Sequence, residues 1–114
     1  MQNPKEKHAE KNNKVPMDYL VYSVLSDDAL CHKHGADKYG KLNWRGSRIK
    51  ASTYVGAIMR HLLAWESGED TDPDSGLSHL THIRACCAVV LDSQNHDSFV
   101  DDRNKVEVIS ATET

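Results

Sequence analysis

The sequence is poor in the features that define several large protein classes. Its 114 residues contain 6% aromatics, three cysteines, three prolines and six glycines. Three is an odd number of cysteines, and Cys86 and Cys87 are adjacent, which argues against a disulfide framework and favours a reducing compartment. No apolar run approaches the roughly 20 residues of a membrane span, and the polar start has no signal-peptide core. We therefore expect a cytoplasmic protein without a membrane segment.

Charge excludes a further class. The formal net charge is −3, with 39% apolar and 27% charged residues, which fits an ordinary globular protein. One short basic run in an acidic chain is not enough for stable nucleic-acid binding through charge. The length predicts one domain with a modest core.

The order of polar and apolar residues predicts an all-α fold, a small helical bundle over residues 14–94. Residues 1–13 are expected to be a flexible polar tail, and residues 95–114 an acidic tail with a possible short strand at 106–109. Three segments carry an apolar stripe at helical spacing, near residues 27–38, 52–67 and 75–92. Their expected N-caps are Ser26, Ser52 or Thr53, and Asp74 or Ser75.

The helix near 75–92 is apolar on nearly every side, so we expect it at the centre of the bundle, with Cys86 and Cys87 as small core residues. A bundle of this size alone would leave Leu62, Trp65 and Leu91 exposed. We therefore expect a homo-oligomer.

The segment from Arg60 to Asp92 concentrates groups that bind metals. Five carboxylates fall between residues 66 and 74, and His79 and His82 are three apart on the helix that follows. His61 lies near the end of the preceding helix and can approach the same loop. Together these residues predict a divalent metal site. The alternative is that the acidic loop is only solvated, and that the histidines cap the helix or hold the turn.

Residues 34–50 are basic and rich in turn-forming residues. We interpret the segment as a loop in which Lys38, Lys41, Arg45 and Arg48 neutralise phosphates, while Tyr39 or Trp44 stacks on a base. Charge complementarity across the surface explains the same residues without a ligand.

Three stretches carry a family resemblance: HGADKYGKLNWR, YVGAIMRHLLAWESGED and DPDSGLSHLTHI. Over roughly residues 14–92 the chain resembles the N-terminal domain of phage dATP/dGTP diphosphohydrolases, relatives of the MazG nucleotide pyrophosphohydrolases. The resemblance implies an all-α oligomer in the host cytoplasm that cleaves purine deoxynucleoside triphosphates with Mg²⁺ or Mn²⁺. MazG enzymes hold the metal with an EExxE run and an ExxD run. Here Gly56, Ala57 and Arg60 occupy the first, and His79 and His82 the second.

A histidine-containing site suits Mn²⁺ or Zn²⁺ better than Mg²⁺, which prefers oxygen ligands. Two hypotheses follow: a metal-dependent nucleotide diphosphohydrolase, or a non-catalytic protein that binds a nucleotide or a host protein. In the enzyme hypothesis the expected metal ligands are His61, Glu69, Asp72, His79 and His82. Glu66, Glu69 and Asp74 are the expected catalytic residues. The expected substrate contacts are Lys38, Tyr39, Asn43, Trp44, Arg45 and Arg60.

Overall fold

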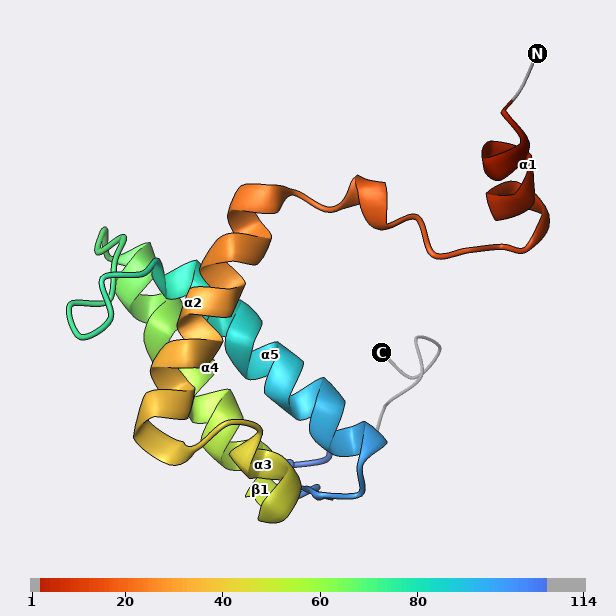
Figure 1. Ribbon diagram of the computed structural model, residues 1–114. Coiled ribbons are helices and arrows are strands. Elements are labelled where there is room, and N and C mark those ends of the chain that lie inside the picture. Colours follow the sequence, from red (N-terminus) through yellow and green to blue (C-terminus); the bar gives the residue numbers. More distant parts are fainter. Residues whose placement is uncertain (1–2, 107–114) are drawn as a thin grey trace, which may run out of the picture.

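The computed structural model describes residues 3–106, except the side chains of Ala9 and Lys11, and most of these residues are helical. Figure 1 shows the order of the elements. The helices are α1 (Pro4–Lys11), the 3₁₀ turn η1 (Met17–Tyr19), α2 (Tyr22–Tyr39), α3 (Asn43–Gly46), α4 (Ala51–Glu66) and α5 (His79–Asn95). The strands are β1 (Ile49–Lys50) and β2 (Phe99–Val100). The predicted all-α class is confirmed.

Helix α5 is the central element, as its apolar sequence predicted. Helices α2, α3 and α4 all pack against it. A bidentate ion pair from Arg84 to Asp28, with N–O distances of 2.8 and 3.0 Å, joins α5 to α2. Because α2 and α4 both pack against α5, they flank its surface on two sides, and side chains from the two helices face each other across α5.

The two strands tie the end of the described chain back to the start of α4. They run parallel, with Ile49 opposite Phe99 and Lys50 opposite Val100. This pairing brings Asp102 to the N-terminus of α4, where its carboxylate accepts from the backbone N–H and the hydroxyl of Ser52. The predicted Ser52 or Thr53 cap is therefore wrong, since α4 begins at Ala51 and Asp102 supplies the acceptor. Of the strand predicted at 106–109, only Val106 is described, and it is not in a strand.

The other two predicted caps are also wrong. Helix α2 begins at Tyr22, one turn before Ser26, because the mostly apolar residues from 20 to 25 extend the helical stripe toward the N-terminus. Asp28 lies inside the helix, where its carboxylate accepts from Arg84. Helix α5 begins at His79, and its N-cap Ser78 accepts from the backbone N–H of Leu80 at 3.1 Å. Asp74 and Ser75 remain in the loop before it.

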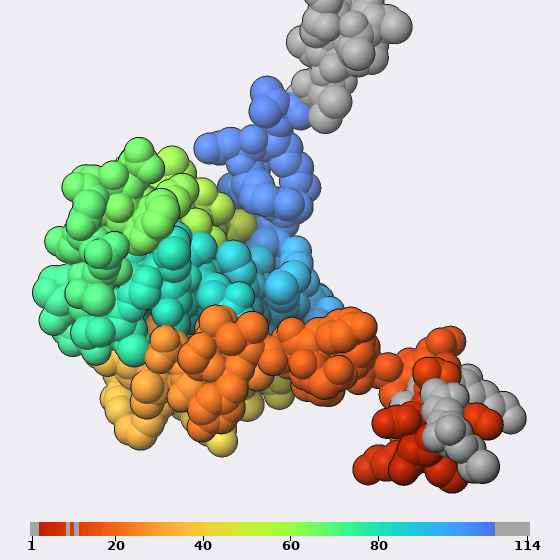
Figure 2. All heavy atoms as spheres, turned by 90° about the horizontal axis from the view of Figure 1, so that it is seen from above, coloured from red at the N-terminus to blue at the C-terminus, as the bar shows by residue number. Residues whose placement is uncertain are grey.

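Helix α1 forms where the sequence analysis expected no structure. Asn3 caps it by accepting from the backbone N–H of Lys5 at 2.8 Å, and Pro4 holds a φ suited to the first helical position. Local capping is its main support, because α1 lies away from the bundle beyond an extended segment (Figures 1 and 2).

The buried apolar residues among those described are few: Cys31, Ile49, Ala51 and Val89. Cys87 is exposed, so its predicted place in the core is wrong, and Cys86 is only half-buried. Leu62, Trp65 and Leu91 are 46%, 39% and 63% exposed, as expected of this bundle alone. Whether a second copy covers them stays a prediction. No helix in residues 3–106 combines the length and apolar character of a membrane span.

Candidate metal and nucleotide site

A groove of ≈ 930 Å³ lies over α5, between α2 and α4. His82, Ala85 and Val89 of α5 line its floor, at the three- and four-residue spacing of one helix face. Its walls include Cys31 and Lys38 of α2, and Tyr54, Ala57 and His61 of α4. The small alanine side chains leave room between the helices. The groove has one polar end at His61 and Asp72 and another at Trp44 and Asp92.

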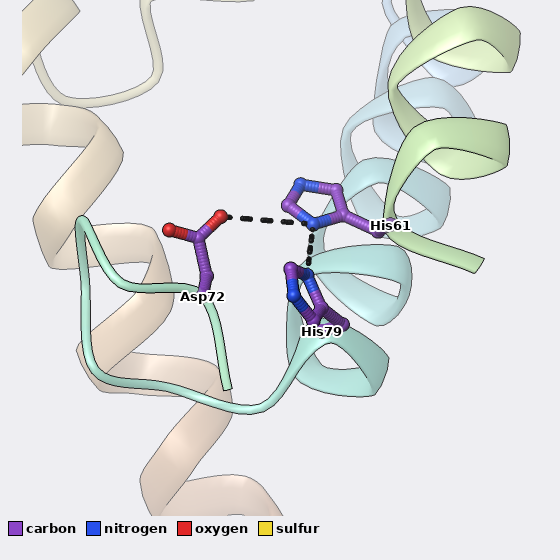
Figure 3. Close-up of side chains that lie close together, drawn as sticks. All are labelled: His61, Asp72 and His79. Atoms are coloured by element: carbon purple, nitrogen blue, oxygen red, sulfur yellow. Dashed lines mark hydrogen bonds and ion pairs between the residues drawn. The ribbon is translucent and has the colours of Figure 1, made fainter. Parts of the chain in front are cut away.

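Three potential metal ligands converge at the first end. His61, Asp72 and His79 each place a nitrogen or oxygen within 4.8 Å of the others. Figure 3 shows His61 from α4, His79 from α5 and Asp72 from the connecting loop facing one another. The Nδ1 atoms of the two histidines are 2.8 Å apart, and Asp72 Oδ2 is 3.8 Å from Nδ1 of His61. Three of the five ligands predicted from the sequence therefore meet at one point.

Tight turns in the α4–α5 loop bring Asp72 to this point. The backbone N–H of Asp72 donates to Leu77 O at 2.8 Å, and that of Gly76 donates to Asp72 O at 2.7 Å. Gly68 and Gly76 have φ of +101° and +74°, which glycine adopts at little cost. Thr71 and Ser78 form an antiparallel bridge across the base of the loop. The loop is thus folded back on itself, with Asp72 held beside His61.

Glu69 contacts the outer side of the same group. Its Oε1 is 2.7 Å from His79 Nε2, and His79 itself is only 4% exposed. A carboxylate accepts, so Nε2 carries the proton and Nδ1 of a neutral His79 keeps its lone pair toward His61 and Asp72. A carboxylate behind a histidine is a common way to orient a metal ligand. Glu69 therefore lies behind the predicted ligands, outside the group of three.

His82 lies beside this group with both ring nitrogens engaged. Its Nε2 is 2.6 Å from the hydroxyl of Ser75, and its Nδ1 is 3.4 Å from Sγ of Cys31. Its ring stacks on the ring of His61 with centroids 4.6 Å apart and planes 9° from parallel. The group of three does not include His82. His82 therefore lies between the ring of His61 and its own partners in α2 and the loop, and limits the movement of the His61 ring.

The protonation states suit metal ligation. Burial lowers the pKa of His61, against the opposing effect of Asp72, and burial followed by the charge of His61 lowers the pKa of His82. For Asp72, burial works to raise the pKa, but backbone N–H groups of Asp74 and Ser75, with the nearby histidines, lower it overall. Neutral imidazoles and an ionised carboxylate are the forms that bind a metal. Two imidazoles and one carboxylate, with positions left open, form a donor set that fits a catalytic divalent ion such as Mn²⁺ or Zn²⁺.

Two nitrogen donors of α2, Lys38 and His34, line the groove near His61 and Asp72. Lys38 Nζ and His34 Nε2 both contact Oδ2 of Asp74, with the histidine nitrogen at 3.2 Å. The ion pair raises the pKa of Lys38 and lowers that of Asp74. All three side chains line the groove. Lys38 and His34 thus direct two hydrogen-bond donors at one oxygen at this end of the groove.

At the other end, Asp92 holds two of the residues expected to contact a nucleotide. Arg45 donates to both of its oxygens at 2.8 Å, and Trp44 Nε1 donates to Oδ2 at 2.7 Å. Arg45 and Trp44 together hold the pKa of Asp92 well below its usual range. We call Trp44, Arg45 and Asp92 the Asp92 clasp. It fastens α3 to α5, and Arg45 itself is not among the residues lining the groove.

The remaining predicted site residues divide between groove and surface. Tyr39 and Asn43 line the groove. Glu66 is exposed at the end of α4 and does not line it. Arg60 is also exposed and outside the lining, with its guanidinium close to Gly56, where an added Cβ would lie 3.2 Å from it. Of the positions that correspond to the EExxE run, only Ala57 borders the groove.

Comparison with known proteins places the chain in a family. Residues 4–103 match the family described as dATP/dGTP diphosphohydrolase, N-terminal. The chain belongs to this family. A relative from Salmonella phage PMBT28, named dATP/dGTP diphosphohydrolase, is 33% identical over 90 residues, which is 79% of this chain and 30% of the relative. The chain thus spans about a third of the length of this curated relative. No solved structure matches it.

Sequence reasoning missed four residues of this member of the dATP/dGTP diphosphohydrolase N-terminal family. They are Cys31, His34, Ser75 and Asp92. Cys31 and Ser75 contact His82, His34 contacts Asp74, and Asp92 accepts from Trp44 and Arg45. By residue type His34 is a potential ligand along with Asp27, Asp28 and His32, but caps and solvent-facing polar residues explain all four equally well in the sequence. The contact partners of all four lie seven to 51 residues away. Only the fold reveals these pairings.

Proposed function

We propose that the groove binds a purine deoxynucleoside triphosphate, dATP or dGTP, and that the chain hydrolyses it with a divalent metal held by His61, Asp72 and His79. The observation that carries the proposal is the convergence of these three side chains beside a groove long enough for a nucleotide, with His61 and Asp72 in the groove lining and His79 behind them. The six groove-lining positions from His82 to Asp92 span about 15 Å of helix at 1.5 Å per residue. The substrate class comes from the name of the phage relative.

The residues of the chain have distinct roles in this proposal. His61, Asp72 and His79 would hold the ion, which when bound supplies charge neutralisation on the phosphates and an acidified water. Glu69 keeps His79 in the tautomer that presents Nδ1, and His82 fixes the plane of the His61 ring. Lys38 and His34 bind phosphate oxygens through charge-assisted hydrogen bonds. Tyr39, Trp44 and Tyr54 offer aromatic surface to the base farther along the groove.

The donor set favours Mn²⁺ or Zn²⁺ over Mg²⁺, because two of the three donors are imidazole nitrogens. A second function, nucleotide binding without hydrolysis, is favoured by one specific feature. Gly56, Ala57 and Arg60 stand where MazG enzymes carry their EExxE glutamates, and the histidine end of the groove is the one replacement candidate within residues 3–106.

Product analysis separates the two functions. The chain is incubated with dATP, dGTP, ATP, GTP and dCTP, with Mn²⁺ or Mg²⁺, and products are resolved by anion exchange. We expect dATP and dGTP to give the monophosphate and pyrophosphate with Mn²⁺, and the His61→Asn variant to give no product. Calorimetric binding of dATP or dGTP with no product from the wild-type chain would support the binding function instead. Neither binding nor hydrolysis would reject both.

A further inference from the structure

Two nitrogen donors of α2, the Lys38 ammonium and the His34 imidazole, converge on a single carboxylate oxygen. Lys38 and His34 are four residues apart, so they lie on one face of α2, and both contact Oδ2 of Asp74 in the α4–α5 loop. The contact lies at the groove wall, with the Lys38 side chain 45% and the Asp74 side chain 63% exposed. Two donors directed at one oxygen are also the arrangement that binds a phosphate oxygen.

The ion pair is exchangeable because it is exposed. Solvent-exposed ion pairs contribute little to stability, since water screens them and the side chains lose freedom in forming them. A phosphate offers more negative charge and more acceptor oxygens than a carboxylate, so the same donors bind it more strongly. A phosphate that enters the groove therefore competes favourably with Asp74 for Lys38 and His34.

We propose that Asp74 occupies the place of a substrate phosphate on Lys38 and His34, and that the triphosphate displaces it. That the phosphate belongs to a nucleotide rests on the proposed function, but the anion site does not. Asp74 is then an internal competitor that lowers the affinity of the chain for phosphates. It also prevents Lys38 from carrying an unpaired charge in the unoccupied groove.

Displacing Asp74 also affects the metal-binding group. The backbone N–H of Asp74 donates to Oδ1 of Asp72 at 2.8 Å, and Asp72 Oδ2 faces His61. A movement of Asp74 away from α2 is therefore transmitted to the carboxylate that would bind the metal. Phosphate binding and the placement of Asp72 are coupled through the loop backbone, whose N–H groups at Asp74 and Ser75 hold the Asp72 carboxylate.

A purely structural role for Asp74 gives a different expectation. If Asp74 only fastens the loop to α2, removing its charge loosens the loop and leaves phosphate affinity unchanged or weaker. If Asp74 competes with phosphate, removing its charge strengthens phosphate binding. The sign of the change in affinity decides between the two.

The test is calorimetric titration with inorganic tripolyphosphate, in chelator and at low ionic strength, so that neither metal nor hydrolysis enters. We expect Asp74→Asn to bind about tenfold more tightly than wild type, and Lys38→Met with Asp74→Asn to lose that gain. The matched control is Asp101→Asn, which removes the same charge from a carboxylate paired with Arg103 and Lys105, all three of them outside the groove lining. It should bind as wild type, apart from the small effect of net charge.

Asp74→Ser serves as a second variant, and circular dichroism melts establish that each variant is folded. Equal or weaker binding by both folded Asp74 variants overturns the proposal. An equal gain in Asp101→Asn also overturns it, because the effect would then be one of net charge. Because the probe is inorganic and metal-free, tighter binding by Asp74→Asn alongside no hydrolysis of dATP or dGTP would reject the proposed function while supporting this inference.

Discussion

The two polar ends of the groove use similar residue types in opposite ways. In the Asp92 clasp, the indole N–H of Trp44 and two guanidinium N–H groups of Arg45 all donate to the carboxylate of Asp92. The other end is the histidine cluster, which comprises His61, His79 and His82 with Asp72. Here the potential metal ligands of α4, α5 and the loop between them face one another. Two imidazole nitrogens face each other at 2.8 Å, and the nearby carboxylate is 3.8 Å from one of them.

The difference separates a structural contact from a candidate site. A bidentate arginine–carboxylate pair is self-sufficient and fixes the position of α3. The two imidazoles of the histidine cluster compensate one another less well, because at most one of the facing nitrogens can donate to the other. A ligand or metal that accepts their lone pairs therefore gains more at the histidine cluster than at the Asp92 clasp. We therefore expect substitutions at the histidine cluster to change the response to a metal, and substitutions at the Asp92 clasp to change the stability of the fold.

The largest expected effect is on metal-dependent stability at the histidine cluster. Binding at a hundred times Kd would stabilise the fold by about 2.7 kcal/mol, a rise in Tm of several degrees. We expect Mn²⁺ to raise the Tm of the wild-type chain and His79→Gln, which keeps a polar group in the buried position, to abolish that rise. Glu69→Gln should weaken Mn²⁺ affinity about 10- to 100-fold, as for loss of a carboxylate behind a ligand.

The control for this prediction is His32→Gln, which removes a histidine of the groove wall that is outside the cluster. Its Mn²⁺-dependent rise in Tm should equal that of wild type. Differential scanning fluorimetry over a Mn²⁺ series, with and without chelator, measures all four proteins. If Mn²⁺ does not change the Tm of the wild-type chain, the proposed metal site is wrong and the histidine cluster has a structural role only.

The histidine cluster shows how far sequence spacing carries. The hairpin, the central place of α5 and the convergence of His61, Asp72 and His79 could all be predicted, because they depend on helix periodicity and on loop length. The three-residue spacing of His79 and His82 placed both on one face but could not separate them. Three residues of helix leave a difference of about 60° in direction, enough to turn His79 toward α4 and His82 toward α2.

The Asp92 clasp shows where spacing fails. Arg45 and Trp44 lie in a basic, turn-rich segment, and Asp92 lies near the end of an apolar helix nearly 50 residues later. The same sequence permits Arg45 to bind either a phosphate or a carboxylate, and local pattern contains no information on which is nearby. The parallel pairing of β1 with β2 and the capping of α4 by Asp102 were missed for the same reason. Each depends on residues brought together by the complete fold.

The next largest effect is expected at the Asp92 clasp, in stability rather than in binding. Arg45→Ala should lower the Tm by a few degrees, because it removes both hydrogen bonds from Arg45 to Asp92 and loosens α3 on α5. Its affinity for tripolyphosphate should remain that of wild type. Arg48→Ala is the matched control, since Arg48 lies in the same segment and has no ion pair within residues 3–106. Circular dichroism melts and calorimetry would contradict this prediction if Arg45→Ala melted like Arg48→Ala but lost affinity.

The smallest expected effect is a dependence of stability on pH that belongs to the histidine end alone. Burial holds the pKa values of His61 and His82 below the ordinary 6.5, so below that pH the unfolded chain binds more protons than the folded chain. Their contribution is fully present above pH 6.5 and is lost as the pH falls through 6.5 toward the lowered values. The slope is at most about 1.4 kcal/mol per pH unit for each group. Asp72 and Asp92 contribute in a separate pH window, because their lowered pKa values mean that their stabilisation is lost only below the ordinary 3.8.

Urea unfolding between pH 8 and 5 in chelator should therefore show a flatter dependence of stability on pH for the double variant His61→Asn with His82→Asn than for wild type. Arg45→Ala should keep the wild-type slope at lower overall stability. A double variant as steep as wild type would place the titration elsewhere and end the distinction between the two ends on this property.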